Sequence, residues 1–222
     1  MTGAPARVVL ATRNAGKVGE LRALFGAAGI SVDDLAAVGL PLEEPAEDTL
    51  ELHDGFESNA RAKARWFAAR LPGHVVLADD SGLMVDALDG APGVRSKRWS
   101  GSTASGSHLH AENNAALLRA LGGASSRSAR FVSVVVCVDG EREWVARGEC
   151  EGTILFAPSG DGGFGYDPLF SSDELGVSFG VASREAKSSV SHRGRSFRGL
   201  LEQWRAARDA SNDAVDPRRS SD

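Results

Sequence analysis

The sequence predicts an α/β domain, because short apolar runs typical of buried strands alternate with segments of helical periodicity. One apolar run, residues 7–12, is followed by apolar residues at helical spacing, namely Val18, Leu21, Leu24 and Phe25. Another run, residues 75–78, closes on two adjacent carboxylates, Asp79 and Asp80. The chain has 222 residues, of which 42% are hydrophobic and 25% charged, so it can form one sizeable domain with a buried core.

The N-terminal half is expected to contain two strands and two helices. Acidic residues and turn formers dominate residues 31–57, which indicates a loop with weak structure. The expected elements are, in order, a strand over residues 7–12, a helix ending at Gly29, this loop, a helix from Ser58 or Asn59 to just before Pro72, and a buried strand over residues 75–79.

The C-terminal half is expected to contain a hairpin between helices. Residues 89–108 are rich in glycine and serine, which is typical of a long ordered loop that carries function. The expected elements are this loop, a helix over residues 111–121, a hairpin of residues 130–138 with 141–149 around Asp139-Gly140, a glycine-rich loop over residues 159–165, and a helix over residues 195–208. The chain is polar from Asp209, so we expect one domain over residues 1–208 and a disordered tail over residues 209–222.

Charge and apolar segments exclude some classes of function. A formal net charge of −5 and a pI near 5.6 argue against a nucleic-acid polymer or an anionic membrane as the main partner. No run approaches the roughly 20 apolar residues of a membrane span, and the first residues lack the apolar core of a signal peptide. We therefore expect a cytoplasmic protein. Cys137, placed opposite Arg142 on the predicted hairpin, lies far from Cys150, so both are expected to be free thiols.

The segment Asp79-Asp80-Ser81-Gly82 is the first candidate for a functional site. An ionised carboxylate at the end of a buried strand is costly unless a cation, a metal ion or hydrogen-bond donors compensate it. Open α/β sheets also bind ligands outside the carboxyl ends of their strands. Taken alone, the pair is explained better by a turn in which one aspartate caps the chain and the other is solvated, and only the further motifs favour a site.

A second motif, Thr12-Arg13-Asn14-Ala15-Gly16-Lys17, follows the first strand and opens a helix. It places backbone N–H groups next to a hydroxyl, an amide and an ammonium group, and such groups bind phosphate. Its spacing differs from the Walker pattern, which has two glycines five residues apart before Lys and Ser or Thr. A plain helix cap with a solvated Lys17 is the alternative.

The segment before the second predicted helix is strongly acidic. One or two of its residues could join Asp80 on a divalent cation, since Mg²⁺ prefers few carboxylates together with waters and phosphate oxygens. The acidic residues are Glu43, Glu44, Glu47, Asp48, Glu51, Asp54 and Glu57. Asn59 and Lys63 are four residues apart, so they share a helix face and can reach an anion together.

Two later motifs supply groups suited to a base or an anion. In Gly162-Gly163-Phe164-Gly165-Tyr166-Asp167-Pro168, two aromatic rings can stack on a base and the carboxylate can accept hydrogen bonds from ring N–H groups. Two core aromatics on a tight turn are the alternative. Lys187 and Ser191-His192-Arg193 bring two cations and an imidazole together just before the last helix.

Taken in order, six motifs resemble those of the inosine triphosphate pyrophosphatase family. They are Thr12-x-Asn14-x-x-Lys17, Asn59-Ala60-x-x-Lys63-Ala64, Ala78-Asp79-Asp80-Ser81-Gly82-Leu83, Gly90-x-Pro92-Gly93-Val94-x-Ser96, Gly163 to Pro168, and Lys187 with Ser191-His192-Arg193. They span residues 7 to about 205 and are specific as a set. Members of this family hydrolyse ITP, dITP and XTP to the monophosphate and pyrophosphate with Mg²⁺, which removes deaminated purines from the nucleotide pool.

The resemblance also implies a fold, an assembly and residue roles. The fold would be an elongated mixed β-sheet flanked by helices, in two lobes with a nucleotide-binding cleft between them, and the protein would be a homodimer. Asp80 would be the general base and an Mg²⁺ ligand. The substrate contacts would be Thr12, Arg13, Asn14, Ala15, Gly16 and Lys17 at the triphosphate, with Asn59, Lys63 and Ser81, and Phe164, Gly165, Tyr166, Asp167, Lys187, His192 and Arg193 around the base.

The second metal carboxylate lies where the sequence departs from the family pattern. The family's metal-binding glutamate lies eight residues before its motif asparagine, and counting back from Asn59 gives Glu51. The family commonly has Glu-Thr-Gly before a Thr-Phe pair and Glu-Asn-Ala after it, whereas this chain has Leu52-His53-Asp54-Gly55-Phe56 and Ser58-Asn59-Ala60. Glu47 is therefore a competing candidate.

Two other functions stay open from the sequence. A purine-nucleotide binding or sensing module would need the base and phosphate residues but no metal carboxylates, so the presence of Asp80 disfavours it. A related house-cleaning pyrophosphatase would use the same motifs on another modified nucleotide.

Overall fold

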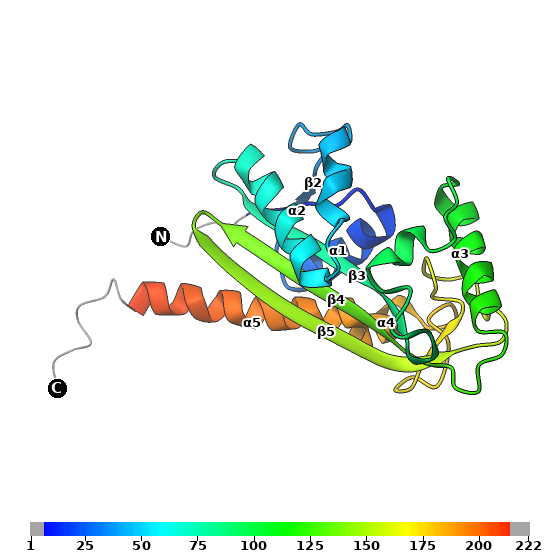
Figure 1. Cartoon of the computed structure of the whole chain (residues 1–222). Coiled ribbons are helices and arrows are strands. Elements are labelled where there is room, and N and C mark those ends of the chain that lie inside the picture. The colour runs from blue at the N-terminus through cyan, green and yellow to red at the C-terminus, as the bar shows by residue number, and fades with distance from the viewer. Residues whose placement is uncertain (1–6, 214–222) are drawn as a thin grey trace, which may run out of the picture.

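The computed structural model describes the backbone of residues 7–213 and the side chains of residues 7–207. Within these residues the chain forms a mixed β-sheet of six strands in the order β2-β1-β3-β4-β5-β6 (Figure 1). The strands are β1 (Val8–Leu10), β2 (Val32–Asp34), β3 (Val75–Val85), β4 (Ser128–Asp139), β5 (Arg142–Ile154) and β6 (Phe170–Ser172). β1 runs parallel to both neighbours, whereas β3 to β6 pair antiparallel. The predicted α/β class is confirmed.

Helices cover both faces of the sheet, because the side chains of a strand alternate between its faces. On one face, Ala78 of β3 packs in a cluster with α2 (Phe56–Arg70). On the other face, Leu77 packs in a cluster with α1 (Ala15–Ala27) and α5 (His192–Asp213). Figure 1 shows α2 and α5 on opposite sides of the long hairpin of β4 and β5.

A third group of buried side chains fills the other end of the sheet. It includes Leu83 of β3, Phe131 of β4 and Leu117 of α3 (Gly106–Ala120). The remaining short helices are η1 (Pro45–Glu51), η2 (Asp86–Leu88), η3 (Gly93–Arg98) and α4 (Arg184–Val190). The core is thus divided between two ends of one elongated sheet, in agreement with the two lobes that the resemblance implies (Figure 1).

β3 is longer than the predicted strand, and this changes the place of the two aspartates. The strand continues through Asp79 and Asp80 because β4 pairs with it as far as Val85, which lies opposite Ala129. The expectation that these carboxylates end the strand is therefore wrong. They lie in its middle, where alternation directs them to opposite faces of the sheet.

The acidic segment is more ordered than expected. Residues 31–57 contain β2, η1 and the start of α2, which begins at Phe56, earlier than predicted. η1 has Pro45 in its first turn, and the side chains of Glu44 and Glu47 each accept a hydrogen bond from the other's backbone. The sequence pattern did not reveal this cap, because the usual Ser, Thr, Asp or Asn is replaced by glutamate.

The hairpin of β4 and β5 is confirmed, but its register is shifted. The turn is Gly140-Glu141, which places Cys137 opposite Trp144 instead of Arg142. Gly140 has a φ of 61°, which suits the first position of a two-residue turn. Cys137 and Cys150 are both free and buried, as expected.

Other boundaries also differ from the expectation. Residues 89–108, predicted as irregular, contain η3 and the start of α3. α5 begins at His192 and runs to Asp213, so residues 209–213 of the expected tail are helical. Residues 214–222 lie outside the described part of the chain, and the domain limits stay a prediction. None of the described helices has the length and apolar character needed to cross a membrane.

Gly148 of β5 lies where the sheet and α5 touch through their backbones. A Cβ atom on this residue would overlap the carbonyl oxygen of His192 and the amide nitrogen of Ser196. We expect Gly148→Ala to lower the free energy of unfolding by about 1–3 kcal/mol or more, because backbone groups cannot move aside as a flexible side chain can. Chemical denaturation measures this change.

Gly19→Ala is the matched control, since nothing lies within 4 Å of an added Cβ at this position of α1. We expect it to raise the free energy of unfolding by about 0.5–1 kcal/mol, because alanine favours the helix. A Gly148→Ala protein as stable as the wild type would contradict the close packing of β5 and α5.

Candidate active site

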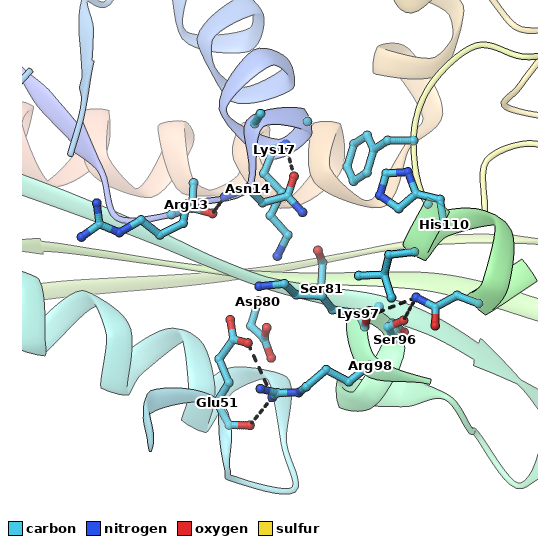
Figure 2. A pocket seen from close by; sticks show the side chains of 18 of the residues that line it. Arg13, Asn14, Lys17, Glu51, Asp80, Ser81, Ser96, Lys97, Arg98 and His110 are labelled. Carbon is cyan, nitrogen blue, oxygen red and sulfur yellow. Dashed lines mark hydrogen bonds and ion pairs between the residues drawn. The ribbon is translucent and has the colours of Figure 1, made fainter. Parts of the chain in front are cut away.

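A cavity of about 470 Å³ lies beside the middle of β3. Its walls come from segments far apart in the sequence: the start of α1, the end of η1, α2, η3, the start of α3, and the segments around Asp167 and His192. In Figure 2, Lys17, Asp80 and Glu51 are directed toward the same space. The structure therefore brings the phosphate, carboxylate and base motifs together.

The cavity is open on this side because β3 is longer than β1. β1 ends at Leu10, which pairs with Leu77, so among the described strands none pairs with the next residues of β3 on that edge. The edge carbonyl of Asp79 instead accepts hydrogen bonds from Lys63 Nζ at 2.8 Å and Lys17 Nζ at 3.4 Å. Two ammonium groups, one from α1 and one from α2, are thereby fixed beside the cavity.

The Asp79 side chain is fully buried, and cations and hydrogen-bond donors compensate its negative charge. Its carboxylate lies 2.6 Å from Lys17 Nζ and accepts hydrogen bonds from Ser133 Oγ at 2.8 Å and Ser81 Oγ at 3.1 Å. Arg193 Nε lies 3.5 Å away. Burial opposes its ionisation, but Lys17 and Arg193 outweigh burial and hold the pKa of Asp79 well below its ordinary value. Asp79 is therefore an anchor for the cations of the cavity.

Asp80 faces α2 and is held more loosely. Asn59 Nδ2 donates to its carboxylate at 3.0 Å, and Lys63 Nζ lies 3.3 Å away. Burial raises the pKa of Asp80 above its ordinary value; Lys63 and Lys17 offset this only in part, and the nearby charge of Glu51 adds to it. Asp80 thus takes up a proton more readily than Asp79, which suits a general base.

Glu51 and Glu47 have different partners. Glu51, the last residue of η1, lies 3.0 Å from Lys63 Nζ, so Glu51 and Asp80 share one ammonium group. Burial opposes the ionisation of Glu51, but Lys63 lowers its pKa to about 2. Glu47 instead accepts a forked pair of hydrogen bonds from Arg13. Of the two candidates for a second metal carboxylate, Glu51 is the one beside Asp80.

The phosphate motif forms the N-terminus of α1. Asn14 caps the helix by accepting a hydrogen bond from Lys17 N at 3.1 Å, and Thr12 Oγ1 accepts one from Asn14 N at 3.2 Å. Gly16 lies against the ring of Phe164, where an added Cβ would come within 2.7 Å of the ring. A larger residue there would have to displace the Phe164 ring, so the glycine lets the motif's backbone approach this ring.

The glycine-rich motif contributes a ring and a buried acid. Phe164 is half-buried and lines the cavity. Asp167 accepts hydrogen bonds from Phe164 N at 2.7 Å and Lys187 Nζ at 2.5 Å, which fixes the motif to α4. Tyr166 is 4% exposed, and its hydroxyl donates to the Ser96 carbonyl at 2.8 Å. Phe164, rather than Tyr166, therefore offers its ring face to a ligand.

Lys187 of α4 and Arg193 at the start of α5 share a carboxylate from α1. Glu20 lies 2.6 Å from Lys187 Nζ and also pairs with Arg193 Nη1. Burial opposes its ionisation, but Arg193 and Lys187 lower the pKa of Glu20 to about 2. His192 stacks on Phe131 with ring centroids 4.7 Å apart, and burial, with the charge of Arg193, lowers the pKa of His192 well below its ordinary value. Its imidazole is neutral near pH 7.

All residues expected at the site line the cavity except Asn59, which is fully buried behind Asp80. Sequence reasoning missed Glu20, although it lies three residues after Lys17, a spacing that puts both on one helix face. It also missed Ser133, whose role depends on strand pairing and leaves no local signal. Further missed residues of the cavity are Lys97, Arg98, His110, Asn113 and Phe131 (Figure 2 labels the first three).

Known proteins resemble this chain over most of its length. A model of the Ham1 family matches residues 8–203. A dITP/XTP pyrophosphatase from Nitratidesulfovibrio vulgaris is 46% identical over 206 residues, which are 90% of this chain and 97% of that protein. Another from Aromatoleum aromaticum is 46% identical and covers 88% of this chain and 95% of that protein. The solved structure of a HAM1 protein from Coxiella burnetii is 32% identical, with a TM-score of 0.76 over 90% of this chain and 99% of that one. These matches confirm the resemblance inferred from the six motifs, and the chain belongs to the Ham1 family.

Proposed function

We propose that this protein hydrolyses the deaminated purine nucleoside triphosphates ITP, dITP and XTP to the nucleoside monophosphate and pyrophosphate. The observation that carries the proposal is that Asp80 and Glu51 share the Lys63 ammonium in a cavity that also contains Lys17 and Phe164. The relatives named dITP/XTP pyrophosphatase cover nearly the whole chain and support the same activity. The enzyme is the single domain expected over residues 1–208.

Mg²⁺ is the proposed cofactor, with Glu51 and Asp80 as its protein ligands. The donor set fits this ion, because both residues supply hard carboxylate oxygens and Mg²⁺ takes its other ligands from water and substrate phosphate. In the described part of the chain no group of three or more His, Cys, Asp or Glu side chains is arranged to hold a metal ion. When bound, Mg²⁺ would neutralise part of the charge that develops on the leaving pyrophosphate.

The residues of the chain supply positioning and proton transfer. Lys17 and Lys63 bind phosphate oxygens together with the amides at the start of α1. Asp80 orients a water molecule and takes its proton while the water oxygen bonds to the α-phosphorus. The bond from that phosphorus to the bridging oxygen breaks, and pyrophosphate leaves. Because the Asp79 carbonyl already holds both ammonium groups, little rearrangement precedes the reaction.

Base selection is assigned chiefly to His192. Hypoxanthine and xanthine present a 6-oxo acceptor and an N1–H donor where adenine presents the reverse pattern. His192 is buried and neutral, and its Nδ1 has no hydrogen-bond partner among the described residues. Arg193 contacts Glu20, Ser81 and Asp79 and supports the wall beside it. Sites built on such hydrogen bonds can discriminate by about 10⁴ or more.

The proposal extends to the enzyme's assembly and surroundings. The resemblance to the family supports a homodimer. The acidic net charge of −5 and the two free, buried cysteines support a cytoplasmic location with the nucleotide, rather than a nucleic-acid polymer or a membrane, as partner.

Asp80→Asn removes the proposed base while keeping the shape of the side chain. We expect kcat for ITP to fall by about 10²–10⁴, the usual contribution of a general base, with the thermal midpoint close to that of the wild type. A pyrophosphate-release assay and a thermal melt measure the two quantities.

Asp79→Asn is the comparison, because Asp79 is the neighbouring carboxylate on the opposite face. It removes the carboxylate charge that pairs with Lys17 and is shared with Arg193, so we expect the free energy of unfolding to fall by about 3–5 kcal/mol. Near wild-type kcat in Asp80→Asn would refute the role of Asp80 as base.

Pyrophosphate release from ITP, XTP, dITP, GTP and ATP, with Mg²⁺ present or chelated, tests the substrate class. We expect release from the first three, turnover of ATP lower by about 10⁴, and loss of all turnover on chelation. Binding without release from any nucleotide would favour a binding module instead. A preference for GTP or a modified pyrimidine would favour a different house-cleaning pyrophosphatase.

A further inference from the structure

Arg13 belongs to the phosphate motif, yet its side chain points away from Lys17 (Figure 2). Its guanidinium donates to both carboxylate oxygens of Glu47 at 3.0 and 2.7 Å, and to the carbonyls of Leu40 and Leu42 at 2.6 and 2.7 Å. A guanidinium has five N–H donors, and four interactions occupy most of them. Glu47 also neutralises its charge, so Arg13 is poorly placed to bind a phosphate.

These contacts fasten the segment that leads into η1. Arg13 binds it at three positions along the chain, the last of which is Glu47 inside η1. Glu47 is 9% exposed and also accepts a hydrogen bond from Glu44 N at 3.1 Å, which caps η1. The guanidinium thus holds both the entry to η1 and its first turn.

η1 carries Glu51 at its other end. Leu50, one residue earlier, is buried in the cluster with α2, while Glu51 lies beside Lys63 and Asp80. A helix of two turns that is fixed at its start and packed through Leu50 has little freedom to move its last residue. The position of Glu51 therefore depends on the anchoring of Glu47.

We propose that Arg13 is a positioning residue that acts through Glu47 to hold Glu51 beside Asp80, and so links the phosphate motif to the carboxylate pair. The inference rests on the proposed function, in which Glu51 and Asp80 hold a divalent cation. It replaces the expectation that Arg13 contacts the substrate. Arg13 lies between Thr12 and the cap residue Asn14, so its side chain joins the start of α1 to η1.

The test is binding of Mn²⁺ alone, without nucleotide, followed by electron paramagnetic resonance in the full-length protein. We expect Arg13→Met and Glu47→Gln each to raise the Kd for Mn²⁺ by about 10- to 100-fold, the usual cost of losing a residue that orients a metal ligand. The double variant is expected to bind Mn²⁺ no more weakly than either single variant, because each substitution already breaks the same interaction between Arg13 and Glu47. Arg13→Lys keeps the positive charge but not the forked hydrogen bonds, so its Kd for Mn²⁺ should lie between those of the wild type and Arg13→Met.

Two further measurements separate positioning from substrate contact and from stability. ITP binding in excess chelator should stay within about twofold of the wild type in Arg13→Met, and saturating Mg²⁺ should restore its kcat. Arg22→Met is the matched control, since Arg22 joins α1 to Asp34 of β2 through an exposed pair at 3.1 Å away from the cavity. It should leave the Kd for Mn²⁺ unchanged.

Unchanged Mn²⁺ affinity in folded Arg13→Met or Arg13→Lys would overturn the inference. So would a loss of ITP affinity in chelator without a change in Mn²⁺ affinity, because that result would make Arg13 a substrate ligand. Failure of the wild type to bind Mn²⁺ or to hydrolyse ITP would overturn the proposed function itself, and the inference with it. The first two results leave the wild-type activity intact, so failure of the inference can be distinguished from failure of the proposed function.

Discussion

Three segments of the chain meet at Asp79. Lys17 of α1 and Arg193 of α5 pair with its carboxylate, and Lys63 of α2 bonds to its carbonyl. A buried charge of this kind is tolerated only when it is matched by cations and hydrogen bonds. The same contacts that make Asp79 tolerable also hold two ammonium groups beside the cavity before any ligand arrives. The arrangement of the site is therefore a by-product of compensating one buried anion.

Asp79 and Asp80 have different surroundings because successive side chains of a strand point to opposite faces of the sheet. Asp79 faces α1 and α5, where Ser133 and two cations surround it completely. Asp80 faces α2, where burial raises its pKa and Glu51 stands close by. Environment, rather than residue type, separates the buried anchor Asp79 from Asp80, the proposed proton acceptor, and strand geometry puts the two in different environments.

Local patterns were sufficient to predict β1, the start of β3 and the hairpin of β4 and β5, but not β2, β6 or the way in which the site residues are brought together. The six motifs contain about half of the residues that line the cavity, because phosphate, metal and base binding each require particular side chains. The extent of β3 could not be predicted, since charged residues argue against a strand interior unless their partners are known. The partners of Asp79, among them Ser133 and Arg193, come from elements that only the fold brings near. The direction of Arg13 was likewise set by the distant segment before η1.

The alternation in β3 also makes the site sensitive to the length of the strand. Adding or removing one residue in the strand before Asp79 would exchange the faces of every following side chain, while β4 would still demand pairing. Asp79 would then face α2, and Asp80 would face the side of α1 and α5 where Lys17, Ser133 and Arg193 surround Asp79. A single substitution in β3 changes the contacts of one side chain, whereas an insertion or deletion would move every following side chain to the opposite face of the sheet. A change of length in a connecting loop would leave the phase of these side chains unchanged, because it does not shift the pairing of β3 with β4.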